Sequence, residues 1–147
     1  MRKNPTPTRS KENQRQTDVS ALDRLRERCP VPNPYRAGDI CTLLPKGNPD
    51  LRKRAGQWCV VVEVHTFSCS VATWDAVIQV KIENLREVYY SPRHREELYR
   101  LRERLYRLSK AKHDESVRNF LETLGKIDRP FLTSIEEKFL EVLENQP

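Results

Sequence analysis

Residues 57–65, QWCVVVEVH, are the stretch that decides the fold. The segment is dense in β-branched residues, which is typical of a strand because branched side chains pack well on a pleated surface. Val60, Val62 and Val64 alternate along it, and regular strand geometry would place them on one face. We therefore predict a strand here and interpret the neighbouring segments outward from it.

Short segments on either side have the same character. GDICTLLP at residues 38–45 precedes this strand, and CSVATWD, VIQVKI and NLREVYY follow at residues 69–75, 77–82 and 84–90. No segment of helical length separates them, which excludes a parallel α/β sheet. Five short strands with one long loop after the first predict a small, strongly bent β-barrel over residues 36–90.

Several features of this segment are characteristic of a known family. The pair Gly38-Asp39 opens the first strand, Gly56 precedes the valine-rich second strand, and residues 80–85, VKIENL, end in an Asn-Leu turn. In these features residues 36–90 resemble the small SH3-like barrels, especially those of the KOW and transcription-elongation type. The resemblance implies a barrel that binds RNA, DNA, ribosomal or polymerase surfaces, or peptides.

Residues 91–147 are predicted to form a helical region of about three helices. Pro92 suits the first turn of a helix that runs to about Lys112. A second helix begins near Asp114, and Gly125 suits its C-terminal cap.

The third predicted helix follows the segment DRPFLT and has a capping signature. Ser134 and Glu137 have the S-x-x-E spacing of a capping box. Apolar residues recur at helical spacing along one side of this helix. They are Ile135, Phe139, Val142 and Leu143.

Residues 1–35 are predicted to be a flexible basic arm and a Pro-rich linker. The first 19 residues are polar and offer almost nothing to bury, so we expect them to be disordered. Residues 18–29 can form a short helix, which PVPNPY at residues 30–35 would end. The arm lacks the apolar core of a secretory signal, and no stretch is long enough to span a membrane. We therefore expect a cytoplasmic α+β protein with no membrane association.

The charge is distributed unevenly along the chain. The net charge is +6, from 27 Lys and Arg against 21 Asp and Glu. Residues 1–36 carry a net charge of +5, residues 37–90 are neutral, residues 91–112 carry +5 and residues 113–147 carry −4. A basic balance of this kind favours acidic partners such as nucleic acid.

The sequence offers little support for catalysis or metal binding. The histidines are His65, His94 and His113, and no motif of a hydrolase, metalloprotease or P-loop enzyme is present. The cysteines have no C-x-x-C spacing, and Cys41 and Cys59 are expected to be small buried hydrophobic residues. We therefore expect a protein that is not an enzyme and that holds no metal and no cofactor.

The basic helix over residues 91–112 has two different sides. One is a leucine stripe of under two heptads, which favours packing within the molecule over a long coiled coil. Its members are Leu98, Leu101, Leu105 and Leu108. The other side has the chemistry for phosphate contact and base stacking. Its members are Arg95, Tyr99, Arg102, Tyr106 and Lys110.

Two alternatives remain open for this basic helix. It can be an ordinary solvated surface with no ligand. It can also be covered within the molecule by the acidic third helix, through Glu136, Glu141 and Glu144.

The long loop at residues 46–56, KGNPDLRKRAG, is the second candidate site. Three adjacent cations repel one another, so they normally lie in water or against phosphates. A solvated charge run with no ligand is the alternative. The predicted nucleic-acid-binding residues of the loop and the helix are Lys46, Arg52, Lys53, Arg54, Arg95, Tyr99, Arg102, Tyr106 and Arg107.

We therefore predict a non-enzymatic accessory or regulatory protein that binds nucleic acid, either DNA or RNA. The prediction requires that cations of the loop and of the basic helix meet on one exposed surface. The alternative is a protein–protein interaction adaptor that acts through the barrel or the C-terminal helices. An adaptor would expose an apolar groove along the leucine stripe and the third helix.

Overall fold

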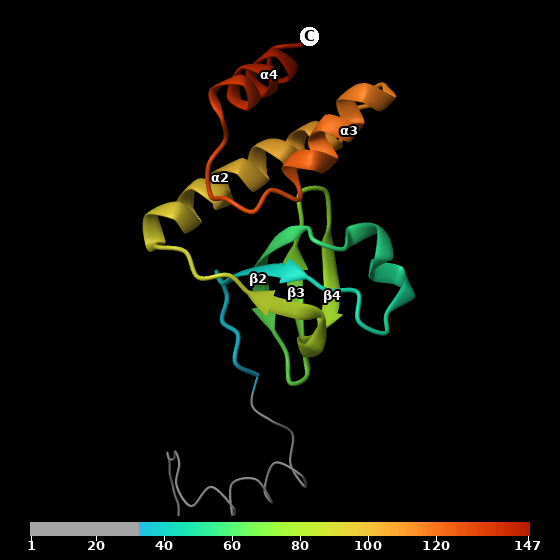
Figure 1. Ribbon diagram of the computed structural model, residues 1–147, viewed down its shortest axis with the longest axis vertical. Coiled ribbons are helices and arrows are strands. Elements are labelled where there is room, and N and C mark those ends of the chain that lie inside the picture. The colour runs from blue at the N-terminus through green and yellow to red at the C-terminus, as the bar shows by residue number, and fades with distance from the viewer. Residues whose placement is uncertain (1–32) are drawn as a thin grey trace, which may run out of the picture. The chain divides into compact units, whose positions relative to one another are not determined.

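The computed structural model describes residues 33–147 (Figure 1). Residues 1–32 of the predicted arm and linker (1–35), with the predicted helix at residues 18–29, lie outside the described part. At the end of this segment, the side-chain amide of Asn33 donates to the carbonyl oxygens of His65 and Ser68. The strands are β1 Ile40–Leu43, β2 Trp58–Val64, β3 Ser68–Ala72, β4 Val77–Lys81 and β5 Leu85–Glu87. The helices are the 3-10 helices η1 Pro49–Arg54 and η2 Ile82–Asn84 and the α-helices α2 Pro92–Ser109, α3 Glu115–Leu124 and α4 Ser134–Glu144.

The five strands form one antiparallel sheet in the order β4-β3-β2-β1-β5. Strands β1 to β4 follow one another as a meander, and β5 returns to pair with β1, where Cys41 lies opposite Glu87. This sheet followed by three α-helices confirms the predicted α+β class. The sheet is open, with β4 and β5 at its edges, so its hydrogen bonds do not close into the predicted barrel.

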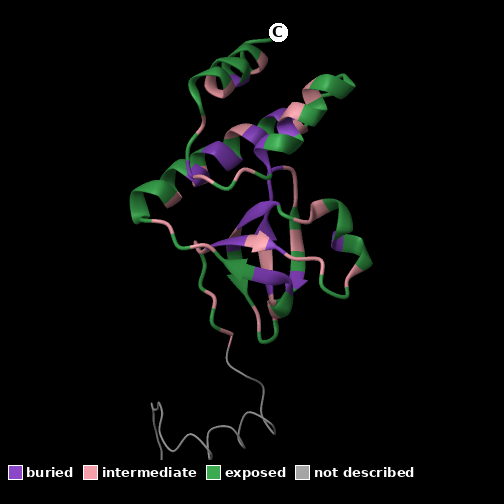
Figure 2. Cartoon of the chain, in the orientation of Figure 1, coloured by how far each residue is buried: buried purple, intermediate pink, exposed green. Residues whose placement is uncertain are grey.

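Each face of the sheet has its own apolar cluster, because successive strand residues point to opposite sides. The inner cluster is enclosed by the bent sheet and η1, and consists of Cys41, Leu43, Leu51, Cys59, Val61, Cys69, Val71, Val80 and Leu85. The outer cluster lies between the sheet and the helices, and includes Ile40, Trp58, Trp74, Leu98, Leu101, Leu105, Leu108, Leu121, Leu124 and Leu140. Buried residues accordingly follow both the strands and α2 (Figure 2). The expected burial of Cys41, Cys59 and the leucine stripe is confirmed.

An irregularity in β2 corrects the expected pattern of its valines. Val60 pairs with Ala72, but the register shifts between Val61 and Glu63, so that Val64 pairs with Cys69. Residues directly opposite in an antiparallel pair share a face, and a bulge changes the alternation by one residue. Val60 therefore packs against the outer cluster, whereas Val64 lies on the side of the inner one. The prediction of one shared face was wrong because it assumed a regular strand.

The helices are attached to the sheet through two tryptophans. The backbone N–H of Trp58 donates to the carbonyl oxygen of Gly125, at 3.1 Å, just after α3. Gly125 lies directly against the ring of Trp74, where a Cβ atom would come within 2.4 Å of Trp74 Cδ1. The predicted cap at Gly125 is confirmed. Its φ of −69° suits any residue, so the structure requires glycine for the close approach of the indole ring.

The N-terminal cap of α4 is one residue earlier than predicted. Thr133 is the N-cap: its hydroxyl accepts a hydrogen bond from the backbone N–H of Glu136, and the Glu136 carboxylate accepts one from the backbone N–H of Thr133. The predicted pair of Ser134 and Glu137 was therefore wrong. Both pairs have the S/T-x-x-E spacing, so this motif did not distinguish them.

The side of α4 that packs inward also differs from expectation. Leu140 is fully buried and Leu143 packs against the outer cluster. Ile135, Phe139 and Val142, from the apolar side recognised in the sequence, are exposed.

Candidate nucleic-acid interface

The turn between β3 and β4 is the point where the loop cations and the basic helix meet. The Arg54 guanidinium donates to the Thr73 hydroxyl at 3.2 Å and to the Asp75 carboxylate at 2.8 Å. From the other side, the Arg102 guanidinium donates to the carbonyl oxygens of Thr73 at 2.7 Å and Ala76 at 3.2 Å. The first loop and the middle of α2 therefore flank the same four-residue turn.

The first loop is held in a defined conformation. Residues 49–54 form η1, whose N-cap Asn48 accepts a hydrogen bond from the backbone N–H of Asp50. Leu51 is buried in the inner cluster, and the side-chain amide of Asn84 donates to the carbonyl oxygens of Leu44 and Lys46. These contacts hold the start and the middle of the loop against the sheet, so its charged side chains project from a supported backbone.

The loop cations line two separate hollows. Lys46 and Arg52 are exposed and line a shallow hollow of about 590 Å³. Lys53 and Arg54 line a second hollow of about 490 Å³ between η1 and α3. Two cations of the helical region, Arg118 and Lys126, line this second hollow as well.

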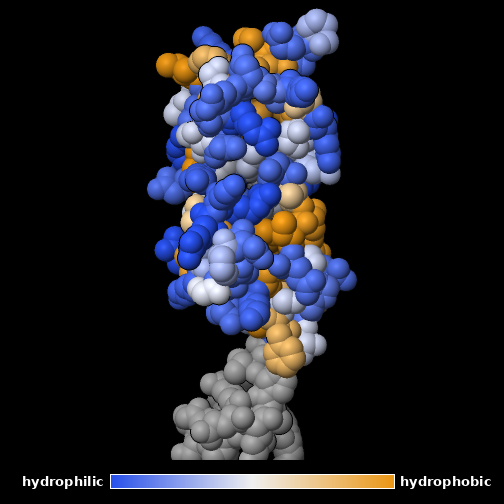
Figure 3. Space-filling view, turned by 90° about the vertical axis from the view of Figure 1, so that its right-hand side faces the viewer, coloured by the Kyte–Doolittle hydropathy of each residue, from blue (hydrophilic) through white to orange (hydrophobic). Residues whose placement is uncertain are grey.

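The charge of the second hollow is mixed. Arg54 pairs with Asp75, and Arg118 lies 3.8 Å from Glu122. Lys53 and Lys126 are exposed. Figure 3 shows this side of the molecule, where hydrophilic side chains cover most of the surface.

The C-terminal half of α2 contributes a short row of charged and aromatic groups beside the turn. Arg102 is 9% exposed and its guanidinium carbon lies 4.2 Å from the centre of the Tyr106 ring. The ammonium group of Lys110 lies 4.2 Å from the same ring and lowers the pKa of the Tyr106 hydroxyl. Arg107 is exposed about 140° farther around the helix from Arg102, outside this row. Arg102 thus supports the turn, whereas Lys110 and Arg107 remain accessible to a ligand.

The N-terminal half of α2 has a different role. The guanidinium of Arg95 donates to the carbonyl oxygen of Tyr90 at 3.2 Å, and the hydroxyl of Tyr99 donates to the carbonyl oxygen of Gly38. Both side chains are half-buried. They join the helix to the chain segments before β1 and after β5, away from the Arg54 and Arg102 contacts.

The acidic third helix covers part of the basic helix. The guanidinium of Arg104 binds the carboxylates of Glu137 and Glu144, and these contacts raise the pKa of Arg104 and lower that of Glu137. This arrangement resembles the alternative considered from sequence, with Glu137 in addition to Glu144. Glu136 instead pairs with Arg129 at 2.8 Å. The cover is confined to Arg104 and does not extend to Lys110 or Arg107.

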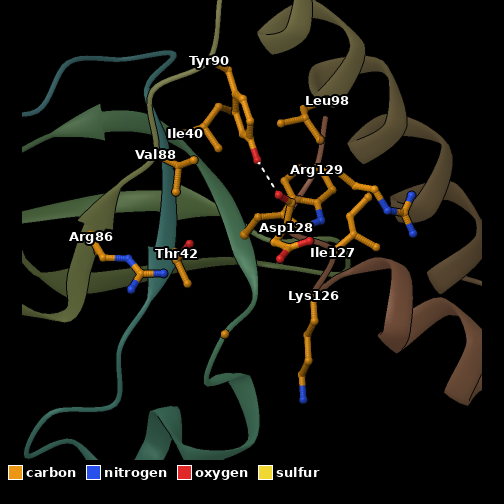
Figure 4. Close-up of a pocket in the computed structure, with 12 residues that line it drawn as sticks. Ile40, Thr42, Arg86, Val88, Tyr90, Leu98, Lys126, Ile127, Asp128 and Arg129 are labelled. Atoms are coloured by element: carbon orange, nitrogen blue, oxygen red, sulfur yellow. Dashed lines mark hydrogen bonds between the residues drawn. The ribbon is translucent and has the colours of Figure 1, made fainter. Parts of the chain in front are cut away.

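A third hollow of about 240 Å³ lies between the outer face of the sheet and the segment that joins α3 to α4 (Figure 4). Ile40, Val88 and Leu98 supply apolar walls, and the Tyr90 hydroxyl donates to the carbonyl oxygen of Asp128 at 3.1 Å across one side. Exposed cations also line this hollow, namely Arg86 and Lys126.

Sequence reasoning missed the cations that the helical region adds beside the first loop. Lys126 lines both the second and the third hollow, and Arg118 lines the second. Both residues belong to the segment 113–147, whose net negative charge concealed them. Their contribution depends on how α3 packs beside η1, which no local pattern encodes.

The buried thiols of the inner cluster are poorly suited to nucleophilic or metal chemistry. Burial raises the pKa of the Cys41 thiol to about 12 and that of the Cys59 thiol well above its ordinary value. Such thiols are poor nucleophiles and poor metal ligands. Within residues 33–147, no three His, Cys, Asp or Glu side chains are grouped as metal ligands. No helix in that range is long and apolar enough to cross a bilayer.

Comparisons of this chain with models of protein families, with curated proteins and with solved structures found no match.

Proposed function

We propose that this chain is a non-enzymatic accessory or regulatory protein that binds nucleic acid on the surface around the β3–β4 turn. The observation that carries the proposal is the shared contact of Arg54 and Arg102 with Thr73. These two arginines come from the first loop and from the basic helix. Their contacts bring the end of η1 and the middle of α2 to the same turn.

The residues of this surface have two different roles. The guanidinium groups of Arg54 and Arg102 bind the turn, so these two residues support the surface. The proposed phosphate contacts are exposed cations, because an exposed ammonium or guanidinium can exchange water for a phosphate oxygen. Those beside the turn are Lys53, Lys110 and Lys126, and the flanking cations are Lys46 and Arg52 in the separate hollow and Arg107 farther around α2. Arg95, Tyr99 and Tyr106 are not part of this contact set, because each is held in contacts within the protein.

We also propose that residues 36–90 are an SH3-like barrel of the KOW type that is incompletely closed. The pairing of β1 with both β2 and β5 and the enclosed inner cluster support this proposal. In this scheme residues 1–35 are a basic arm that adds non-specific attraction to a polyanion, and residues 91–147 are the helical region. A cytoplasmic location is part of the same proposal.

The test is the binding of the full-length protein to fluorescent oligonucleotides, followed by anisotropy over a series of salt concentrations. Single-stranded DNA, single-stranded RNA and a DNA duplex serve as probes. Binding through phosphates requires that the logarithm of the affinity fall linearly as the logarithm of the salt concentration rises. Absence of binding, or an affinity that does not depend on salt, would contradict the proposal.

Because residues 1–32 alone can attract a polyanion, the location of the surface needs a matched pair of variants. Lys53→Gln/Lys110→Gln removes two charges beside the turn. Lys81→Gln/Arg93→Gln removes two exposed charges elsewhere. The first variant should weaken binding about tenfold and reduce the salt slope by roughly two phosphates, and the second should do neither. Equal losses in both would indicate only a general effect of net charge.

The second candidate function is a protein–protein interaction adaptor. The leucine stripe, one part of the groove expected for it, is buried, since Leu98 and Leu105 are at most 1% exposed. The observation that favours it is the apolar side of α4, which is exposed. An adaptor would bind a protein partner with an affinity that changes little with salt.

A further inference from the structure

The third hollow, between the outer face of the sheet and the segment after α3, has walls that are held in place by hydrogen bonds. The backbone N–H of Trp58 donates to the carbonyl oxygen of Gly125 at 3.1 Å. Farther along the same segment, the Tyr90 hydroxyl donates to the carbonyl oxygen of Asp128 at 3.1 Å. Because both walls are fixed in this way, a ligand that enters the hollow has little of the protein left to order.

The interior of this hollow is apolar and small. Apolar side chains from the sheet, from α2 and from the segment after α3 line it, namely Ile40, Trp58, Val88, Leu98 and Ile127. The volume is about 240 Å³, which is below the roughly 300 Å³ at which pockets for drug-sized ligands begin. The hollow therefore has room for one small ring system.

Unused polar groups surround this apolar interior. Within residues 33–147, Arg86 and Lys126 form no ion pair, and the side chains of Thr42 and Asp128 form no hydrogen bond. Figure 4 shows Arg86 and Thr42 on the sheet side of the hollow and Lys126 and Asp128 on the opposite side. Two cations and one carboxylate around an apolar interior suit a ligand that combines a flat ring, an N–H donor and a negative charge.

The third hollow is continuous with the surface around the β3–β4 turn. Lys126 lines both the second and the third hollow. Gly56 lines the third hollow, and the next residue, Gln57, lines the second. A polyanion that is bound at the second hollow therefore reaches the third one past Lys126.

We propose that the third hollow takes one unpaired base of a single-stranded nucleic acid. This inference rests on the proposed function, because the strand reaches the hollow from the surface around the β3–β4 turn. The base lies against the apolar interior, where the carboxylate of Asp128 accepts a hydrogen bond from an N–H group on its edge. The adjoining phosphates bind Arg86 and Lys126.

The hollow distinguishes a single strand from a duplex. Both forms offer phosphates to the exposed cations, so both bind in a salt-dependent manner. A base in a duplex has to leave its stack and its pairing partner before it can enter a pocket, a cost that an unpaired base avoids. The hollow therefore adds affinity for single strands alone.

The test compares three DNA probes by fluorescence anisotropy with the full-length protein. They are single-stranded oligothymidine, an oligomer of abasic residues of the same length, and a duplex of that length. The abasic oligomer carries the same phosphates without bases, so we expect it to bind about tenfold more weakly than oligothymidine. Equal affinities for these two would overturn the inference and leave the proposed function intact. Failure of all three probes to bind would contradict the proposed function itself.

A variant that fills the hollow locates the base. Thr42 is a half-buried residue of β1, and tyrosine suits a strand, so Thr42→Tyr places a ring in the hollow. Its affinity for oligothymidine should fall about tenfold, to the level of the abasic oligomer. Its affinities for the abasic oligomer and the duplex should not change. Thr66→Tyr, at an exposed position between β2 and β3, is the matched control and should bind all three probes as the wild type does.

A second variant decides the question if Thr42→Tyr does not fold, which circular dichroism shows. Arg86→Gln changes an exposed side chain and should weaken oligothymidine binding about threefold, with a salt slope lower by about one phosphate. Lys81→Gln removes an exposed cation that lines none of the three hollows and should have a smaller effect. A folded Thr42→Tyr protein with wild-type affinity for oligothymidine, or with an equal loss for the abasic oligomer, would overturn the inference. Equal effects of Arg86→Gln and Lys81→Gln would overturn it as well.

Discussion

Trp58 of the sheet and Leu124 of α3 are joined by a hydrogen bond in the outer cluster. The indole Nε1 of Trp58 donates to the carbonyl oxygen of Leu124 at 2.8 Å, and both side chains are buried. Leu124 is the last residue of α3, so its carbonyl is one of those that a helix end leaves without an intrahelical partner. The backbone N–H of Ile127 reaches it only at 3.5 Å. The tryptophan thus provides both apolar packing and the shorter hydrogen bond.

This bond predicts different costs for two similar substitutions. Trp58→Phe loses ring volume and also leaves the Leu124 carbonyl with only the long bond from the backbone N–H of Ile127, at 3.5 Å. Trp74→Phe loses similar volume, but its Nε1 has no acceptor among the described residues. We expect Trp58→Phe to lower the free energy of unfolding by about 1 to 2 kcal/mol more than Trp74→Phe does. Urea denaturation of both variants measures the difference, and equal losses would mean that the bond contributes little.

Arg102 should affect stability rather than affinity. Its guanidinium spans two carbonyl oxygens of the β3–β4 turn, a geometry that the single ammonium group of lysine cannot reproduce. We expect Arg102→Lys to lower the free energy of unfolding by about 1.5 to 3 kcal/mol. Arg107→Gln, an exposed change on the same helix, should stay within about 0.5 kcal/mol of the wild type.

The readout that separates these roles is nucleic-acid affinity under conditions where both variants are folded. Arg102→Lys should then bind nearly as well as the wild type, because it keeps the charge and the folded surface. Arg107→Gln should bind more weakly at low salt. A stable Arg102→Lys protein with a large loss of affinity would instead make Arg102 a direct phosphate contact.

The elements of the fold follow largely from local patterns. Residues close in sequence determine the strands, the three helices, the leucine stripe and the cap at Gly125. The spacing of their apolar residues indicates which side of each element is buried. The sequence did not predict the bulge in β2, because the bulge depends on how β2 pairs with β3. The sequence did not predict the exposure of Ile135 either. Arg104 of α2 binds Glu137 and Glu144 of α4, and these tertiary contacts determine which side of α4 is buried.

The candidate site was less accessible to sequence reasoning. Charge and composition identified the basic segments, but they could not distinguish an arginine that faces water from one that supports a turn. Arg54 and Arg102 bind the turn, whereas Arg52 and Arg107 of the same two segments are exposed. Lys126 lies near the first loop because α3 packs beside η1, and the sequence alone does not indicate this packing.

The cysteines predict a simple chemical test. Cys41, Cys59 and Cys69 have no exposed surface, and burial raises the pKa of each thiol. The fourth cysteine, Cys29, lies outside the described residues. In a Cys29→Ser protein we expect no thiol to react with a disulfide reagent in the native state at neutral pH, and all three to react in denaturant. Rapid reaction of a thiol in the folded protein would mean that the inner cluster opens readily.

The contacts of Arg104 predict how stability depends on pH. Arg104 lowers the pKa of Glu137, and Arg129 lowers the pKa of Glu136. A carboxylate with a lowered pKa in the folded state stabilises the protein above its ordinary pKa of about 4.3, and this contribution disappears as the pH falls through the folded-state pKa. The free energy of unfolding should therefore begin to fall when the pH drops below about 4.3.

Arg104→Gln isolates the share of this dependence that comes from the ion pairs between α2 and α4. Without the guanidinium, the pKa of Glu137 returns toward its ordinary value, so folding no longer changes its proton binding. The variant should be less stable than the wild type by about 1 kcal/mol at neutral pH, and the difference should shrink as both proteins are acidified. Urea denaturation at neutral pH and through the acidic range measures both curves. Because Glu137 is partly exposed, added salt should reduce the neutral-pH difference as well. Two curves that stay parallel from neutral to acidic pH would show that Arg104 does not control the protonation of Glu137.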